Sequence, residues 1–220
     1  MDAAPPPLLA LADIDFAYPG QPELFRGLCF SWREGERVGV EGPNGSGKTT
    51  LLRLLMGLEQ PSAGTLCHRG ETVGRDQRAL RRLRLGIGYV AQNSEDQLFS
   101  VTVWEDVAFG PLNLGLKRKE ARARAMEALA ELGVEHLADR ATDSLSGGEK
   151  KLVAIATVWS MRPGALVLDE PTALLDDASA MRVRELLARD ARARVVVSHD
   201  PAFLDQAAPD RRVNLGAVQN

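Results

Sequence analysis

The alternation of apolar and polar positions divides the chain into strand-like ends and a helix-like middle. Near the N-terminus, residues 28–32 and 37–40 are short apolar segments bounded by turns that contain glycine or proline, and this pattern predicts antiparallel strands. Continuous apolar runs at 165–168 and 195–197 are typical of strands that are buried on both faces of a parallel sheet. A helix predicted at 178–189 connects those two runs.

Between these ends the predicted elements alternate and then become helical. The leucine-rich stretch 49–56 follows a glycine-rich loop and predicts a helix that ends at Gly57. A strand at 65–68, an arginine-rich helix at 76–83 and a strand at 87–91 follow it. Further predicted helices, rich in Ala, Glu and Arg, cover the residues 102–109, 117–132 and 150–160.

This order of elements predicts one α/β domain over residues 1–220. Residues 1–93 and 161–220 are expected to form an α/β core with an N-terminal antiparallel β part, and 94–160 an inserted α-helical subdomain. Strands that alternate with helices pack into a right-handed α/β core, and ligands bind such cores at the carboxyl ends of the strands.

Composition narrows the classes of partner. The chain has 27 Lys and Arg against 30 Asp and Glu, a formal net charge of −3, so no general attraction to nucleic acid is expected and an anionic ligand must be held locally. No apolar run approaches the length of a membrane-spanning helix. Cys29 and Cys67 form no CxxC pair, which argues against a zinc site or a disulfide framework and favours a reducing compartment.

Residues 42–49, Gly-Pro-Asn-Gly-Ser-Gly-Lys-Thr, match the phosphate-loop pattern G-x-x-x-x-G-K-[ST] at every fixed position. The loop follows a predicted strand and opens a predicted helix, which is the context that the motif requires. In such a loop the glycine backbone surrounds phosphate oxygens, Lys48 reaches the β and γ phosphates, and Thr49 gives its hydroxyl to Mg²⁺. A plain glycine turn with a solvated lysine is the alternative interpretation.

Two acidic residues, Asp169 and Glu170, directly follow the buried run 165–168. A phosphate loop requires an acid on a neighbouring strand to hold Mg²⁺, and Asp169 fits that role. Glu170 stands where a carboxylate can polarise an attacking water. Taken alone, the pair would more often be a turn that caps a helix, but together with the phosphate loop it predicts a hydrolytic site.

A second glycine-containing turn, Leu145-Ser146-Gly147-Gly148-Glu149, opens the helix predicted near 150–160. Alone it would be a flexible turn, but inward N–H groups at a helix start also bind anions. These residues resemble the signature motif of the ATP-binding cassette ATPases, and the other motifs of that family occur in order over nearly the whole chain. The resemblance implies a P-loop NTPase (RecA-like) core, with ATP and Mg²⁺ as cofactors.

The same resemblance implies roles for residues that a single pattern cannot assign. Gln92 corresponds to the glutamine that touches Mg²⁺ and the attacking water, His199 to the histidine that contacts the γ-phosphate, and Tyr18 to the aromatic residue that stacks on adenine. Asp176 lies in the loop that communicates across a dimer, although Leu174 stands where a glycine is common. The implied nucleotide-binding set is Tyr18, Gly42, Pro43, Asn44, Gly45, Ser46, Gly47, Lys48, Thr49 and Thr50. The implied catalytic residues are Glu170, His199 and Gln92, and the implied Mg²⁺ ligands are Thr49, Gln92 and Asp169.

In that family the signature of one subunit contacts the ATP that another subunit holds, so an ATP-dependent homodimer is implied. Only nine residues follow Arg211, which predicts a monomer or weak dimer without ATP. Residues 93–100 and 102–116 resemble the cassettes of energy-coupling-factor and cobalt/nickel importers, in which this region receives a helix of a membrane subunit. Leu98 and Phe99 are the candidates for that contact, although apolar residues here also pack the helical subdomain.

The hypothesis is therefore an ATPase subunit that powers import of a transition metal ion or a vitamin. Integral membrane transport subunits would hold it at the inner face of the cell membrane, on the cytoplasmic side. The alternatives are a cassette of another transporter branch, a soluble cassette that acts on nucleic acid, and a small P-loop kinase. The chain has no long heptad insertion and no second cassette, which disfavours nucleic acid. A kinase would leave the Ser-Gly-Gly turn and His199 without a role.

Overall fold

The computed structural model describes residues 5–216, and the chain forms two compact units. The first unit comprises Met1–Ile87 and Arg192–Asn220, and the second comprises Gly88–Ala191. The helical segment predicted at 94–160 lies within the second unit. Among residues 5–216, no helix combines the length and the apolar character that crossing a membrane requires.

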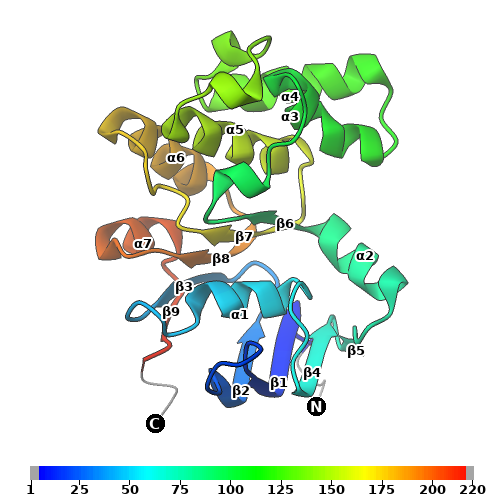
Figure 1. Cartoon of the computed structure of the whole chain (residues 1–220), viewed down its shortest axis with the longest axis vertical. Coiled ribbons are helices and arrows are strands. Elements are labelled where there is room, and N and C mark those ends of the chain that lie inside the picture. The colour runs from blue at the N-terminus through cyan, green and yellow to red at the C-terminus, as the bar shows by residue number, and fades with distance from the viewer. Residues whose placement is uncertain (1–4, 217–220) are drawn as a thin grey trace. The chain divides into compact units, whose positions relative to one another are not determined.

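An antiparallel sheet forms the N-terminal part of the first unit. Its strands β1 (Leu9–Phe16), β2 (Phe25–Trp32), β4 (Ala63–His68) and β5 (Glu71–Thr72) lie in the order β2-β1-β4-β5 (Figure 1). All three pairings are antiparallel, which confirms the antiparallel strand predicted at 28–32. The antiparallel strand predicted at 37–40 is wrong, because this segment lies in the other sheet and pairs in parallel with both of its neighbours. Strand β1 buries its alternate apolar residues, and a register shift follows Leu11.

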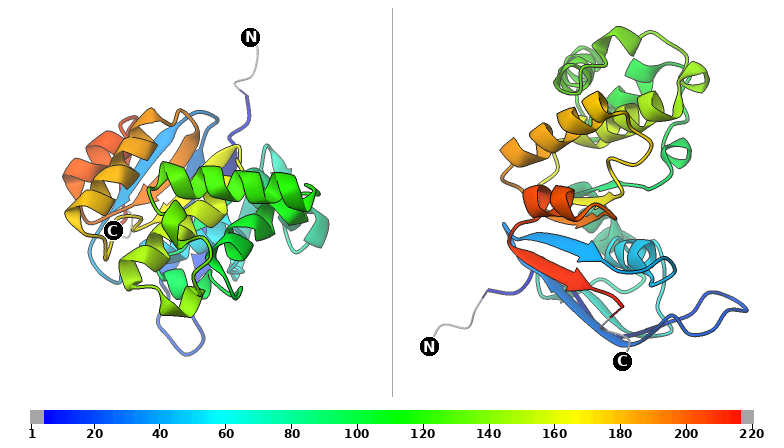
Figure 2. Two further views of the ribbon diagram at one scale, coloured as in Figure 1. Left: turned by 90° about the horizontal axis from the view of Figure 1, so that it is seen from above. Right: turned by 90° about the vertical axis from the view of Figure 1, so that its left-hand side faces the viewer.

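The parallel strands described in the first unit belong to a second sheet. Strand β3 (Arg37–Glu41) pairs with β8 (Ala193–Val197) on one side and with β9 (Arg211–Asn214) on the other, and Figure 2 shows β9 beside β3. Every residue of β8 is buried, which is the pattern of a parallel strand covered on both faces. The prediction of a buried parallel strand at 195–197 is confirmed.

Within residues 5–216, three helices belong to the first unit. They are α1 (Lys48–Leu55), α2 (Gln77–Gly86) and α7 (Pro201–Ala207). The predicted helices at 49–56 and 76–83 correspond to α1 and α2, with small differences at their ends. The hydrophobic pattern does not predict α7 and β9, because α7 has only seven residues and β9 begins with two arginines.

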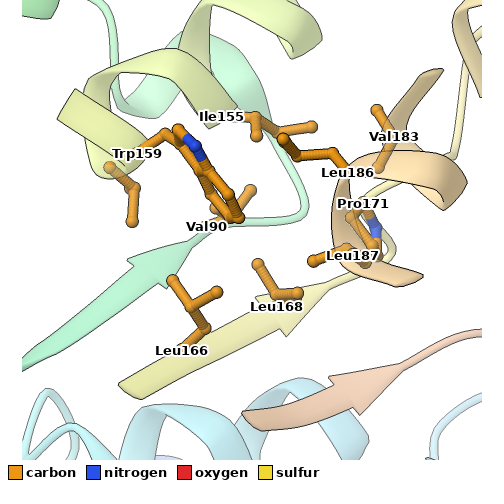
Figure 3. Close-up of a pocket in the computed structure, with 10 residues that line it drawn as sticks. Val90, Ile155, Trp159, Leu166, Leu168, Pro171, Val183, Leu186 and Leu187 are labelled. Carbon is orange, nitrogen blue, oxygen red and sulfur yellow. The ribbon is translucent and has the colours of Figure 1, made fainter. Parts of the chain in front are cut away.

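The second unit places helices against two neighbouring strands, β6 (Ile87–Val90) and β7 (Ala165–Asp169). Helix α5 (Gly147–Ser160) and helix α6 (Asp177–Arg189) direct apolar side chains at these strands, and the side chains surround a small apolar hollow (Figure 3). Trp159 of α5 lies along one side of the hollow. The hollow offers no polar side chain to orient a ligand, so it belongs to the packing of the second unit.

Helices α3 (Val103–Asn113) and α4 (Arg118–Glu131) pack against each other and against α5 (Figure 1). They confirm the helices predicted at 102–109 and 117–132, and α3 continues through Pro111. Short 3₁₀ turns lie between β6 and α3 and between α4 and α5. They are η1 (Ser94–Asp96), η2 (Glu135–Leu137) and η3 (Thr142–Ser144).

Candidate functional site

The phosphate loop of the first unit connects β3 to α1. Gly47 is the N-cap residue of α1 and has a φ of 91°. A Cβ atom at this position would lie 2.5 Å from Cζ of Phe25, so the position requires glycine both for its backbone conformation and for the space available. Gly45 is also left-handed, with a φ of 81°. The loop can therefore turn its N–H groups inward above the start of a helix.

Lys48 is buried and follows Gly47 as the first residue of α1. Its Nζ donates hydrogen bonds to the carbonyl oxygens of Gly42 at 2.8 Å and Pro43 at 2.9 Å. Both acceptors belong to the loop itself, so the ammonium group is held across the loop. Phosphate oxygens that carry a full negative charge are stronger acceptors than these carbonyl groups.

Tyr18 lies beside the first turn of α1. Its hydroxyl hydrogen bonds with the hydroxyl of Thr50 at 3.1 Å, and its ring packs edge-on against Phe16 with centroids 4.9 Å apart. Phe16 is buried and Tyr18 is half-buried. The aromatic residue predicted to contact adenine therefore lies next to the phosphate-loop helix, with part of its surface exposed.

His199 follows the strand that pairs with β3. Val40 and Val197 are register partners in the parallel pair β3 and β8, so residues 42–49 and His199 leave the sheet at the same edge. The His199 side chain is exposed, and Asp200 caps α7 by accepting a hydrogen bond from the Phe203 N–H at 3.1 Å. The first unit thus brings Tyr18, the phosphate loop and this edge of the sheet together.

In the second unit, β7 delivers Asp169 and Glu170. Asp169 ends a fully buried strand and is 0% exposed, whereas Glu170 is 7% exposed and has a φ of 47°. A left-handed conformation is unusual for a residue that carries a Cβ atom. Gln92 follows the neighbouring strand β6 and is exposed. The carboxyl ends of β6 and β7 thus bring together all three residues assigned to the Mg²⁺ and water chemistry of this unit.

The buried Lys151 of α5 connects these strand ends, and it is not among the site residues predicted from the sequence. Its Nζ donates hydrogen bonds to the backbone carbonyl oxygens of Ala91 (2.9 Å), Gln92 (3.0 Å) and Asp169 (3.4 Å). Burial lowers the pKa of Lys151 to about 8, although the carboxylates of Asp169 and Glu170 act in the opposite direction. Its position could have been found from the helical period, because Ile155 and Val158, four and seven residues further on, are buried on the same face.

The predicted signature residues surround the start of α5. Ser146 is the N-cap and forms a capping box with Glu149, whose Oε2 accepts hydrogen bonds at 2.8 Å from both the N–H and the hydroxyl of Ser146. These bonds lower the pKa of Glu149. Leu145 is buried and Gly147 is exposed. A Cβ atom on Gly148 would lie 3.3 Å from the carbonyl oxygen of Leu174, so the signature turn is a close neighbour of the loop after β7.

That loop contains Leu174 and ends at Asp176. Asp176 caps α6 by accepting hydrogen bonds from the N–H of Ser179 at 2.8 Å and from its hydroxyl at 3.0 Å, which lowers the pKa of Asp176. Leu174 is 80% exposed and has a φ of 67°. The structure thus gives a physical reason for a glycine at this position, because the backbone here is left-handed.

Apolar side chains are exposed just beyond Gln92. Phe99 is 66% exposed and packs edge-on against Phe109, while Val101 is 77% exposed. Leu98 is half-buried. The buried carboxylate of Asp106 accepts hydrogen bonds from the N–H groups of Phe99 (3.2 Å) and Ser100 (3.0 Å). These bonds fix the backbone of the segment that displays the exposed side chains.

The candidate Mg²⁺ ligands are Thr49 in the first unit and Gln92 and Asp169 in the second. Hydroxyl, amide and carboxylate oxygens suit this cation, which is commonly bound through one or two protein carboxylates together with substrate phosphates. Within residues 5–216, no group of three or more His, Cys, Asp or Glu side chains could by itself hold a metal. The oxygen donors of each unit, taken by itself, are of the kind that Mg²⁺ accepts.

A glycine-rich loop between a parallel strand and a helix, in an α/β chain with a helical insert, defines a P-loop nucleotide-binding protein. The family model described as ABC transporter matches residues 25–173. The chain therefore belongs to the ABC transporter family, and it is an ATP-binding transport ATPase of that family.

Three relatives are similar over most of this chain. A protein of Nitratidesulfovibrio vulgaris with the general name of an ABC transporter ATP-binding protein is 51% identical over 90% of this chain and 72% of its own length. The cobalt import ATP-binding protein CbiO of Rhodobacter capsulatus is 44% identical over 93% of this chain and 74% of its own length. The energy-coupling factor transporter ATP-binding protein EcfA of Methanothermobacter thermautotrophicus is 43% identical over 91% of this chain and 66% of its own length.

Two solved structures confirm the predicted fold class. The cbiO1 protein of Clostridium perfringens, part of the ABC transporter complex cbiONQ, has a TM-score of 0.74 and 34% identity, with 90% of this chain and 82% of that chain covered. The dimeric bacterial ABC transporter cassette MJ0796 has a TM-score of 0.83 and 27% identity, with 94% and 95% covered.

Proposed function

We propose that this chain is the ATPase subunit of an importer for a transition metal ion or a vitamin, of the energy-coupling-factor or cobalt type. The observation that carries this proposal is the exposed apolar surface at Phe99 and Val101, in a segment that resembles such importers. The names of the EcfA and CbiO relatives support the same branch. The more general name of the first relative is compatible with it.

Nucleotide binding is assigned to the first unit. Lys48 exchanges its bonds to the Gly42 and Pro43 carbonyl groups for bonds to the β and γ phosphates, while the N–H groups at the start of α1 hold the remaining oxygens. Tyr18 presents its ring to adenine, with its hydroxyl held by Thr50. The negative net charge of the chain does not oppose this, because the phosphate contacts are local.

Hydrolysis is assigned to side chains at the strand ends and in the first turn of α1. Thr49, Gln92 and Asp169 would hold Mg²⁺, which neutralises charge on the phosphates when it is bound. Glu170 orients and polarises the attacking water, and His199 contacts the γ-phosphate. The left-handed backbone of Glu170 supports this role, because strained residues cluster at functional sites.

A second copy of the chain is proposed to complete each site. The N-terminus of α5, with Ser146 and Gly147 exposed, would contact the ATP held by the other copy. The similarity to a dimeric cassette structure supports this arrangement. The loop with Leu174 and Asp176 would then lie near the second copy, so ATP binding closes the dimer and hydrolysis reopens it.

Integral membrane subunits are the proposed receivers of this motion. A helix of such a subunit would dock on Leu98 and Phe99, where apolar side chains stand on a backbone that Asp106 fixes. This docking would place the chain at the cytoplasmic face of the membrane. The similarity to cbiO1, which is part of the ABC transporter complex cbiONQ, supports this kind of assembly.

The test is purification of the tagged chain from detergent-solubilised membranes of its own host, with bound proteins identified by mass spectrometry. We expect integral membrane proteins that bind a metal ion or a vitamin, and we expect Phe99→Glu to lose them while retaining ATP hydrolysis. Met181→Glu is the matched control, because Met181 on α6 is an equally apolar residue that is 55% exposed. Partners from a different transporter class, or full retention of the partners by Phe99→Glu, would contradict the proposal.

A further inference from the structure

Lys151 is a charged side chain that is fully buried in α5, close to the residues assigned to Mg²⁺ and water. A lysine ammonium has three N–H donors and accepts no hydrogen bond. The structure gives it three acceptors, the carbonyl oxygens of Ala91, Gln92 and Asp169. The donors and acceptors match in number, so the hydrogen-bonding capacity of the ammonium group is satisfied inside the second unit.

The three acceptors share one property. Ala91 and Gln92 directly follow β6, and Asp169 is the last residue of β7. A single ammonium group therefore ties together the backbones of two neighbouring strand ends, at the positions from which Gln92 and Asp169 extend their side chains. An apolar residue of similar length would fill the same space without the unfavourable desolvation of a charge, so packing alone gives no reason for a lysine here.

A second contact strengthens the same connection. The side-chain amide of Gln97 accepts a hydrogen bond from the Ala91 N–H at 2.8 Å and donates one to the Ala154 carbonyl oxygen of α5 at 3.4 Å. Ala91 is thus held through its N–H group by Gln97 and through its carbonyl group by Lys151. The helix that makes both connections is the one whose first turn carries Ser146 and Gly147.

We infer that Lys151 is a positioning residue, which fixes Gln92 relative to Asp169 and attaches both to the helix that begins with the signature turn. This inference deepens the proposed function and depends on the roles proposed there for Gln92 and Asp169. Lys151 does not touch the reacting atoms. It sets the backbone geometry from which the Mg²⁺ and water ligands extend, and phosphoryl transfer depends mainly on such positioning.

The test compares Lys151→Met, which keeps the length of the side chain and removes its donors, with Lys150→Met. Lys150 is the adjacent lysine of α5, and its Nζ contacts a side chain, Glu95, at 2.6 Å, instead of backbone carbonyl groups. For Lys151→Met we expect kcat to fall about tenfold or more and the Mg²⁺ concentration for half-maximal rate to rise, with KM for ATP close to that of the wild type. The Tm should fall by only a few degrees, because three carbonyl groups lose their donor. Lys150→Met should keep kcat within about twofold.

A measurement without nucleotide or metal provides an independent readout. In hydrogen exchange, Lys151→Met should speed exchange of the amides in residues 91–97 and leave those of α3 and α4 unchanged, whereas Lys150→Met should change neither. If Lys151→Met does not fold, Lys151→Gln carries the test, because its shorter amide keeps two donors and should show a smaller loss of the same kind.

Two outcomes would overturn the inference. One is a kcat of Lys151→Met or Lys151→Gln equal to that of the wild type, with unchanged exchange at 91–97. The other is a parallel loss of kcat, ATP affinity and Tm, with faster exchange throughout the second unit, which would mean a purely structural role. Failure of the proposed function looks different, because the wild type itself would then show no ATP hydrolysis that depends on Glu170.

Discussion

The phosphate loop and the loop after β7 both rely on a left-handed backbone, but they reach it in opposite ways. In the phosphate loop the left-handed positions are occupied by glycines, among them Gly45 and Gly47. In the loop after β7 they are occupied by Glu170 and Leu174, which carry Cβ atoms. The first loop can therefore bind phosphate with its backbone alone, whereas the second accepts strain in order to place a side chain at the site.

Substituting Glu170 is expected to give the largest effect, because the second loop acts through a side chain. Glu170→Gln keeps the shape of the residue and removes its charge, so kcat should fall about 100-fold or more. ATP affinity should be retained, and a dimer of the variant should accumulate when ATP is present. Steady-state ATPase assays and light scattering with ATP measure these outcomes, and retained turnover would refute the role assigned to Glu170.

Lys48→Ala tests the first loop. The variant loses a charge-assisted contact worth about 2 kcal/mol, so we expect Kd for ATP to rise roughly 30-fold. Titration with a fluorescent ATP analogue measures this change. Lys119→Ala on α4 is a suitable control, since Lys119 is exposed. Unaltered ATP affinity in Lys48→Ala would mean that the loop is not the phosphate site.

Gly47→Ala separates backbone strain from crowding. A Cβ atom at Gly47 meets both a φ of 91° and the ring of Phe25, so the free energy of unfolding should fall by about 1–3 kcal/mol. Gly74→Ala is the matched control, because Gly74 has a φ of 52° and nothing within 4 Å of the added atom. Denaturant titrations should show a larger loss of unfolding free energy for Gly47→Ala than for Gly74→Ala. Equal losses would mean that crowding by the Phe25 ring contributes nothing.

Leu174→Gly should give the smallest effect. Relief of the left-handed leucine contributes about 1 kcal/mol, but the greater freedom of glycine in the unfolded chain offsets most of it, so stability should rise by less than about 0.5 kcal/mol. Leu174→Ala keeps the strain and should show no gain. Chemical denaturation measures both variants. A loss of stability in both variants would mean that the leucine side chain stabilises this loop, and a loss in Leu174→Gly alone would mean that the flexibility of glycine outweighs the relief of strain.

The sequence predicted the fold well wherever the signal was local. The phosphate loop is contained in eight consecutive residues between a strand and a helix, and the buried strands at 165–168 and 195–197 are continuous apolar runs. The arrangement around Lys151 could not be predicted in the same way, because its acceptors lie 59, 60 and 18 positions away. Two adjacent lysines suggest a solvated surface, yet only Lys150 is partly exposed.

The same limit applies to the turns that carry the candidate site. Asp169 and Glu170 could be interpreted as a helix cap, whereas the acid that caps the following helix is Asp176. The left-handed backbone of Leu174 leaves no signal in the sequence, since leucine is otherwise a good helix former. It is predictable only from the family resemblance, in which a glycine is common at this position.

The buried carboxylate of Asp106 has a consequence for how partner choice can evolve. It holds the backbone N–H groups of Phe99 and Ser100, so the shape of this segment does not depend on which side chains it displays. Substitutions at Leu98, Phe99 and Val101 can therefore change the chemistry of the displayed surface without refolding the segment beneath it. Descendants of one ancestral ATPase could in this way diverge toward different membrane subunits by a few point mutations. A protein designer could likewise exchange these side chains as a group.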